Sequence, residues 1–536
     1  MTISRRIAAW LDFSIGSRVA AVLAALLAGL LIAAFGGVRG VGLVVGLLGA
    51  VLLIVRPRLA FYLLVLSVPV QDVITVPLGV IDTTITQITF TGTIAAWLLW
   101  RLANNRQTTT VTPITFGFLV FLWCISASLL TTHSMPDSLA EIARWTVTFL
   151  VYLLATNLIR TRKQMGILIG CLLAGGTFEA VLGVTQAFSL SGPLAFLANS
   201  GLLRAYGTIG APNSYAGYID HSLPLAATLA IYWLGAWWRR QSVIIRAQQL
   251  AELRPPSFWD TQRRLTLKAG WLGVLLALAA LLMLTAVILS ESRGAWVGLT
   301  FGSLGIIVAL GRRAVAPLVA LGIVVLLGLA AYQANALPEA LVQRAQSITD
   351  NVRIFDPHGL VPTPDNFSII ERMAQWYAAW GMFQSNPILG VGIGNYTYVY
   401  DMFNVEGWPY SQGHAHNYYL NISAEAGLAG LFGYLVWLGT ALREAARAVR
   451  RTRNNGYYQA IAIGSLGVLL TLMGHNFFEN LHVLNMGVHL SSVLALFYLV
   501  RILPADEANE PSATAEAERS AGWGFNEAEL AKTERE

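Results

Sequence analysis

The sequence predicts an all-α polytopic membrane protein with about 12–14 transmembrane helices. Of its 536 residues, 55% are hydrophobic and only 12% are charged, whereas a soluble domain carries about 25% charged residues. Apolar runs near the ~20 residues that a membrane-spanning helix needs recur from Val19 to Val500. The formal net charge of +6 comes from arginine clusters between these runs. Such clusters set membrane orientation, so no nucleic-acid partner is expected.

Each span is placed where an apolar run reaches bilayer length. Arg5 and Arg6 precede the first run, and no clear small-residue cleavage site follows, so we expect a retained first helix rather than a signal peptide. The segment "VPVQDVITVPLGVIDTTI" contains two prolines and polar residues. This segment could therefore form a re-entrant turn instead of joining two full spans, and the total would then be about twelve spans. The expected helices lie near residues 19–36, 40–55, 60–77, 84–101, 113–131, 140–159, 165–189, 214–237, 269–290, 294–311, 315–333, 417–441, 457–475 and 483–502.

Basic clusters occupy every second connection and predict the orientation. They begin at Arg56, Arg101, Arg160, Arg239, Arg312 and Arg443, and an excess of arginine marks cytoplasmic connections. The predicted regions are a cytoplasmic N-terminus (1–18), a transmembrane domain (19–502), a cytoplasmic connection (238–268), a long extracytoplasmic loop (334–415) and a disordered cytoplasmic tail (503–536).

Two arginines lie on the opposite, outer side, against the charge bias. Arg204 precedes "YGTIGAPN", and Arg293 lies in the short turn "SESRGAW" between two apolar runs. A guanidinium is permanently charged and presents a planar fork of donors that matches phosphate oxygens. At headgroup depth two such forks suit a lipid-linked diphosphate. The alternative is that they pair with Glu291, Asp220 or ordinary phospholipid headgroups.

The stretch "GHAHNYYL" places two histidines before an apolar run. His416 is expected in the first turn of the helix that starts near Asn417. The positive end of the helix dipole disfavours a second positive charge there, so a neutral imidazole can take a proton from a hydroxyl. His414 is expected outside the helix as a lesser candidate. A zinc site at "HAH" would need further ligands of suitable geometry, and we expect no metal.

Four other residues are second-rank site candidates. Arg372 is a third phosphate ligand or a salt-bridge partner, and Glu179 is an acid inside the seventh span, where ionisable groups are costly. His475 and Glu479 lie at an outer helix end, where a polar cap explains them equally well.

The long outer loop and the helix after His416 carry further patterns. Apolar residues from Ile369 to Phe383 recur at helical spacing, which predicts an amphipathic helix on the membrane face. "GVGIGN" at 390–395 lacks the βαβ context of a nucleotide site, so we expect a tight turn. Small residues four apart predict close approach of a neighbouring helix at Ser423 and Gly427, Ala426 and Gly430, and Ala429 and Gly433.

These segments together resemble a known family. "HNYYLNISAEAGLAG" resembles the motif of bacterial O-antigen ligases and related polymerases, with His416, Asn417, Gly427 and Gly430 at its fixed positions. "RAYGTIGAPNSYAGY", "SESRGAWVGL" and "NPILGVGIGNY" are similar to other family segments and occur in the same order. Leu431 stands where the family often has Gly, Thr or Tyr.

The resemblance implies a glycosyltransferase of the GT-C type in the bacterial cytoplasmic membrane, without metal or cofactor. It would move a glycan from undecaprenyl diphosphate to an acceptor hydroxyl at the outer face, with inversion. Arg204 and Arg293 would bind the diphosphate and His416 would activate the acceptor. The acceptor is left open as a lipid, a saccharide or a protein, so ligase, polymerase and protein O-oligosaccharyltransferase are alternatives. A lipid-linked glycan transporter is a further alternative, although its polar groups would be expected near the midplane.

Overall fold

The computed structural model describes residues 56–73, 75–78, 81–103, 109–197, 201–248, 256–311, scattered positions within 315–336, then 354–363 and 366–509. The expected spans 19–36 and 40–55 and most of 315–333 lie outside the described residues. The chain divides into two units, residues 1–63 with 87–108, and residues 64–86 with 109–536.

The first unit contains most of α5 (Ile85–Ala103) and the beginning of α4 (Pro57–Ser67), which ends in the second unit. In the last turn of α5 the Arg101 guanidinium lies 5.2 Å from the centre of the Trp97 ring. A cation at this end of a helix interacts favourably with the helix dipole.

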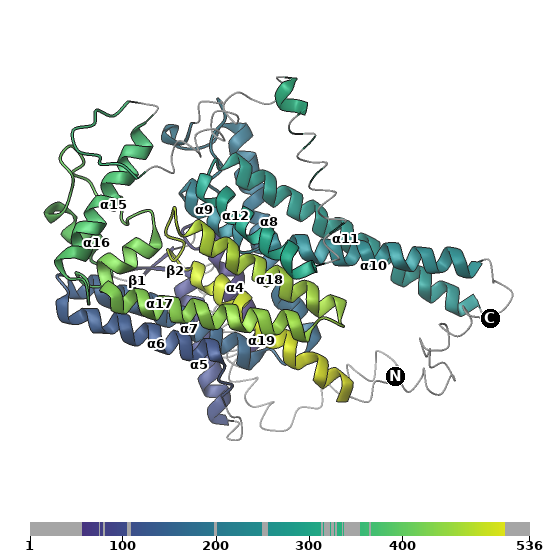
Figure 1. The fold of residues 1–536 in the computed structure, drawn as a ribbon. Coiled ribbons are helices and arrows are strands. Elements are labelled where there is room, and N and C mark those ends of the chain that lie inside the picture. Colours follow the sequence, from purple (N-terminus) through teal and green to yellow (C-terminus); the bar gives the residue numbers. More distant parts are fainter. Residues whose placement is uncertain are drawn as a thin grey trace, which may run out of the picture. The chain divides into compact units, whose positions relative to one another are not determined.

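The second unit is built from long helices (Figure 1). Two strands, β1 (Thr75–Leu78) and β2 (Ile81–Thr84), form an antiparallel hairpin with Thr75 opposite Thr84. The helices are α6 (Pro113–Ala127), α7 (Met135–Leu158), α8 (Arg162–Ser189), α9 (Pro212–Asp220), α10 (Leu223–Gln248), α11 (Pro256–Leu289), α12 (Arg293–Leu310), α15 (Phe367–Ser385), α16 (Tyr396–Val399), α17 (Tyr418–Arg451), α18 (Gly456–His475) and α19 (Met486–Asn509). Short 3-10 turns lie at Val68–Val70, Ser128–Thr131, Leu194–Phe196 and Tyr400–Met402.

Eight helical segments among the described residues are long and apolar enough to cross a membrane. They match the spans expected from 113–131, 140–159, 165–189, 269–290, 294–311, 417–441, 457–475 and 483–502. The all-α, multi-pass fold class is therefore confirmed.

Proline and polar residues explain where the structure differs from the expected spans. The helix expected over 60–77 stops at Ser67, because Pro69 and Pro77 cannot continue it, and the hairpin follows. The span expected over 214–237 is interrupted at His221 and Ser222, between α9 and α10.

Three expected helix ends also move. α10 continues to Gln248 and α11 begins at Pro256, a favourable first residue of a helix, so much of the connection expected over 238–268 is helical. α19 continues to Asn509, beyond the predicted start of the tail at 503. α17 continues to Arg451 rather than ending near 441, and Glu444 and Arg447 pair one turn apart on this extension, 2.6 Å from each other.

Small residues bring two helix pairs into close contact. A Cβ on Gly433 of α17 would lie 3.0 Å from the Cα of Phe121 on α6, so the predicted close approach is confirmed there. α12 meets α18 in the same way, since a Cβ on Gly298 would lie 2.6 Å from the backbone oxygen of Thr471. These contacts hold the beginning of α12 against the end of α18.

Gly427 serves a different purpose from the predicted helix contact. Its φ of 62° and ψ of −161° interrupt the helical backbone of α17. A Cβ there would lie 2.3 Å from the carbonyl carbon of Ile388, so only glycine fits. The backbone N–H groups of Leu428 and Ala429 donate to Pro387 and Ile388 at 2.8 and 3.1 Å. The kink is thus stabilised by hydrogen bonds that α17 donates to a loop, and not by a second helix.

The "GVGIGN" segment, which follows Ile388, also hydrogen-bonds to α17. Val391 and Gly392 donate backbone hydrogen bonds to Ala424 and Glu425 of α17, at 3.0 and 2.9 Å. Its last residue, Asn395, accepts from the backbone N–H groups of His133 and Ser134 at 2.8 and 2.6 Å. The predicted tight turn therefore links the first half of α17 to the connection between α6 and α7.

The helix predicted over 369–383 is confirmed as α15, but its apolar face is covered by protein rather than left for the membrane. Ala378, Ala379 and Met382 are fully buried with Tyr396, Ala415 and Ala424 in one apolar cluster. α15 therefore packs against α17 and the chain that leads to His416.

Candidate active site

His416 lies two residues before Tyr418, the first residue of α17, and so outside the first turn where the sequence predicted it. Asn417 is the N-cap, and its side chain accepts from the backbone N–H of Leu420 at 3.1 Å. His416 itself adopts a positive φ of 50°, which is uncommon outside glycine. Flanking bonds fix this turn, because Ala415 donates to the Asn421 side chain at 3.0 Å and Tyr418 donates to the Asn476 carbonyl at 2.8 Å.

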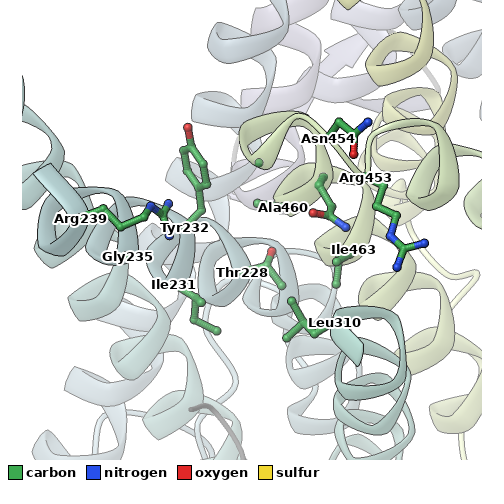
Figure 2. Close-up of a pocket in the computed structure, with 12 residues that line it drawn as sticks. Thr228, Ile231, Tyr232, Gly235, Arg239, Leu310, Arg453, Asn454, Ala460 and Ile463 are labelled. Carbon is green, nitrogen blue, oxygen red and sulfur yellow. The ribbon is translucent and has the colours of Figure 1, made fainter. Parts of the chain in front are cut away.

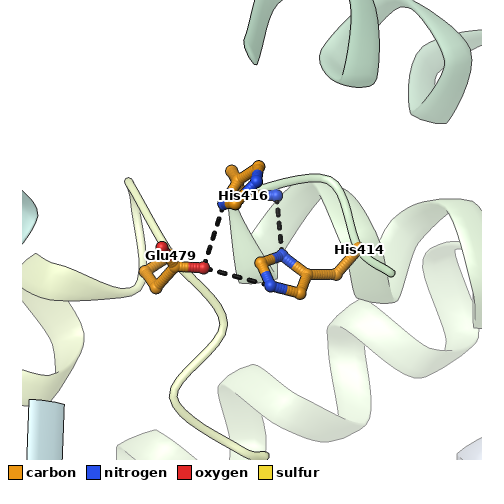
Figure 3. A group of neighbouring side chains, drawn as sticks. All are labelled: His414, His416 and Glu479. Carbon is orange, nitrogen blue, oxygen red and sulfur yellow. Dashed lines mark hydrogen bonds and ion pairs between the residues drawn. The ribbon is translucent and has the colours of Figure 1, made fainter. Parts of the chain in front are cut away.

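Glu479 joins the two histidines, as Figure 3 shows. Its Oε1 lies 3.0 Å from Nδ1 of His416 and 3.1 Å from Nε2 of His414. The Glu479 side chain is 3% exposed, against 16% for His416, so the carboxylate lies beneath the imidazole. Because it contacts these rings, Glu479 is not simply a cap of α18.

The hydrogen bonds assign a role to each histidine nitrogen. Nδ1 of His414 accepts from the backbone N–H of His416 at 3.0 Å, so the neutral ring carries its proton on Nε2 and donates to Glu479. When His416 is neutral and donates from Nδ1 to Glu479, its Nε2 keeps a free lone pair. Among the described residues no group is hydrogen-bonded to that Nε2. In this arrangement the carboxylate can orient the ring so that Nε2 accepts a proton.

Charge and burial maintain this arrangement. Burial lowers the pKa of His414 to about 4, an effect that Glu479 opposes and that His416 and Arg372 reinforce. Burial opposes the charge on Glu479, but the two histidines and Arg372 outweigh burial and hold the pKa of Glu479 well below its ordinary value. His414 is therefore a neutral donor to an ionised carboxylate at neutral pH.

The same three side chains form a group that could hold a metal ion, since their ligand atoms lie within 4.8 Å of one another. However, a nitrogen that carries a proton has no lone pair for a metal. Nε2 of His414 becomes a ligand only if the hydrogen bond from the His416 backbone to Nδ1 is lost. The hydrogen bonds thus fit a histidine–carboxylate pair better than a zinc site.

Arg204 connects to this pair through one asparagine. Its Nη2 donates to Oδ1 of Asn213 at 3.2 Å, and Nδ2 of Asn213 donates to Oε2 of Glu479 at 2.8 Å. Nε of Arg204 donates to the carbonyl of Ser290 at 2.8 Å. The structure therefore brings Arg204 to the turn that precedes Arg293.

Arg293 and Arg372 approach from α12 and α15. Arg293 is the first residue of α12 and is 8% exposed, and its Nη2 donates to the Ser368 hydroxyl at 3.3 Å. Ser368 and Arg372 are four residues apart on α15 and so share one face of that helix. The positive charge of Arg372 lowers the pKa of both Glu479 and His414. Arg372 thus lies near the histidine–carboxylate pair, and Arg293 contacts the same face of α15.

Two second-rank candidates are not part of this group. Glu179 accepts from the Thr208 backbone at 3.0 Å and from the Thr208 hydroxyl, so it orders the loop that carries Arg204. His475 is buried and its Nδ1 lies 3.0 Å from Asp220. Among the described residues no hydrogen bond or ion pair joins either one to His416.

Sequence reasoning missed two contacts of the arginines, Asn213 and Ser368. Asn213 lies within the quoted "APNSYAGY" segment, but an uncharged amide in the first turn of a helix has many ordinary roles. Ser368 lies 75 residues from Arg293 and has no motif around it.

The fold and this site are those of a multi-pass membrane protein in which a buried carboxylate contacts two histidines, with arginines on α12, on α15 and in the loop before α9. Residues 278–435 match the family model described as O-antigen ligase. Over these residues the chain is similar to a family whose function is ligase- or polymerase-like. The matched range includes Arg293, Arg372 and His416 and leaves out Arg204 and Glu479. No curated protein matches the chain.

Proposed function

We propose that this chain transfers a glycan from undecaprenyl diphosphate to an acceptor hydroxyl, with inversion at the anomeric carbon. The observation that carries the proposal is the contact between His416 and Glu479, 3.0 Å long, next to Asn213 and Arg204. It supplies a base beside groups that suit a diphosphate.

The reaction is a single displacement. Nε2 of His416 takes the proton of the acceptor hydroxyl while the acceptor oxygen bonds to the anomeric carbon. The bond from that carbon to the diphosphate oxygen breaks, and the diphosphate leaves with the electron pair. Glu479 then stabilises the imidazolium through Nδ1–H. Arg204 and Arg293, with Arg372, meet the charge that develops on the leaving diphosphate.

The site is proposed to face the outer side of the bacterial cytoplasmic membrane. The basic clusters at Arg239 and Arg443 support this orientation, because they belong to connections opposite the histidines. A lipid-linked donor reaches such a site within the bilayer. The acceptor is a lipid, a growing saccharide or a protein hydroxyl, which separates ligase, polymerase and protein O-oligosaccharyltransferase activity.

The test is transfer by purified full-length protein from a labelled polyprenyl-diphosphate glycan, with the three acceptor classes offered in parallel. A new glycosidic product with one class supports the proposal and names the acceptor. His416→Ala should abolish the product, whereas His358→Ala should not, because His358 is an exposed histidine paired with Asp356. Movement of donor across vesicles without bond formation would instead identify a transporter.

A further inference from the structure

A cavity of about 710 Å³ lies between α10, α18 and the end of α12 (Figure 2). Its volume is in the range of small-molecule sites, about 300–1,000 Å³. α18 begins at this cavity with Gly456 and ends at His475, just before Glu479. Its 20 residues span about 30 Å, so the cavity lies at the membrane face opposite the histidine–carboxylate pair.

The cavity changes from charged to apolar along α10 and α18. Arg239 and Arg453 lie on its two sides, as Figure 2 shows, while Ile231 and Ile463 line it farther along the two helices. The helices run antiparallel here, because Gly456 lies beside Tyr232 and Gly464 beside Leu225. The seven helical steps from Gly456 to Ile463 extend about 10 Å into the bilayer.

The end of the cavity at Arg239 and Arg453 carries an uncompensated positive charge among the described residues. The structure describes no ion pair for either Arg239 or Arg453, and both side chains are exposed. The nearby acid Glu444 already binds Arg447 and Arg501. The first turn of α18 adds the positive end of a helix dipole. An anion therefore fits this end of the cavity.

The apolar end indicates a lipid rather than a soluble anion. The Ile231 side chain, farther into the cavity than the arginines, is 44% exposed. A soluble phosphate compound held at the arginines would not cover this apolar side chain. We infer that the cavity binds an anionic glycerophospholipid, with its phosphate near Arg239 and Arg453 and an acyl chain along Ile231 and Ile463. This site is separate from the proposed transfer chemistry and does not depend on it.

Native mass spectrometry of the full-length protein in neutral detergent tests this inference, with phosphatidylglycerol and phosphatidylcholine as probes. Phosphatidylglycerol should bind in preference to phosphatidylcholine. Arg239→Gln and Arg453→Gln should each weaken its binding about fivefold, because a basic residue near the surface contributes about 1 kcal/mol. Arg240→Gln is the matched control, since Arg240 neighbours Arg239 but does not line the cavity, and it should bind as wild type.

A second variant fills the cavity without removing charge. Gly235→Leu favours the helix and projects into the cavity, so it should lose phosphatidylglycerol while the arginines remain. Equal binding of the two lipids, or equal losses in the Arg240 control, would overturn the inference. So would full competition by free glycerol phosphate, which would identify a soluble ligand. Retention of lipid by Gly235→Leu would also contradict it.

Discussion

Nδ1 of His416 lies 3.0 Å from Oε1 of Glu479, although 63 residues separate them along the chain. The contact forms because α17 begins beside the end of α18, where Tyr418 donates its backbone N–H to Asn476. A buried carboxylate beneath a half-buried imidazole fixes the ring and leaves Nε2 available. The two side chains should therefore act as one unit.

Removing either partner should impair transfer, and the effects should not add. General-base catalysis contributes about 10²–10⁴-fold, so His416→Ala should lower kcat by about that factor while donor binding persists. Glu479→Gln keeps the shape but loses the charge, and should lower kcat by roughly 10²-fold. The double variant should be no slower than His416→Ala alone. Additive losses in single-turnover assays would mean that the two residues act separately.

Lysine cannot replace the arginine fork. Arg204→Lys loses the paired contacts to Ser290 and Asn213, and Arg293→Lys loses the planar group that reaches Ser368. Each variant should fold yet lose transfer about tenfold or more, with weaker donor binding. Arg447→Lys, paired with Glu444 on the extension of α17, is the control and should transfer normally. Normal activity in both Arg204→Lys and Arg293→Lys would show that these arginines do not bind the diphosphate through their planar groups.

Acid should destabilise the protein partly through His414. The pKa of His414 is lowered to about 4 in the folded chain, whereas an unfolded histidine titrates near ~6.5. The unfolded state therefore binds more protons between these values, and stability falls as pH falls through that window. The lowered pKa of Glu479 acts with the same sign at lower pH. Thermal unfolding of His414→Gln should depend less on pH between about 6.5 and 5 than that of wild type. Parallel curves would show that His414 is not neutral in the folded state.

Hydropathy was sufficient for the fold class, because a membrane-spanning helix must be continuously apolar whatever its neighbours are. It also made Arg204, Arg293 and His416 site candidates, because they are ionisable groups beside apolar runs. It could not rank Glu479, since the same pattern serves as a helix cap. The pairing of Glu479 with His416 depends on which helix ends lie side by side, and hydropathy does not contain this information. The kink at Gly427 was missed for a similar reason, since a small residue in a helix reads as a helix contact.

Changing Gly427 should test whether the kink in α17 supports the site. Gly427→Ala would force a Cβ against the carbonyl carbon of Ile388, 2.3 Å away, at a φ of 62°. A strained position of this kind costs about 1–3 kcal/mol, so the unfolding temperature in detergent should fall measurably.

Gly439 provides the matched control on the same helix. A Cβ at Gly439 meets nothing within 4 Å, and alanine there should be neutral or stabilising by about 0.5–1 kcal/mol. Any Gly427→Ala protein that folds should also transfer more slowly, because residues 387–392 hydrogen-bond to the first half of α17, which begins just after His416. If the two alanine variants unfold at the same temperature and transfer equally, the hydrogen bonds from Leu428 and Ala429 to the loop do not stabilise the site, and another contact must hold the base in place.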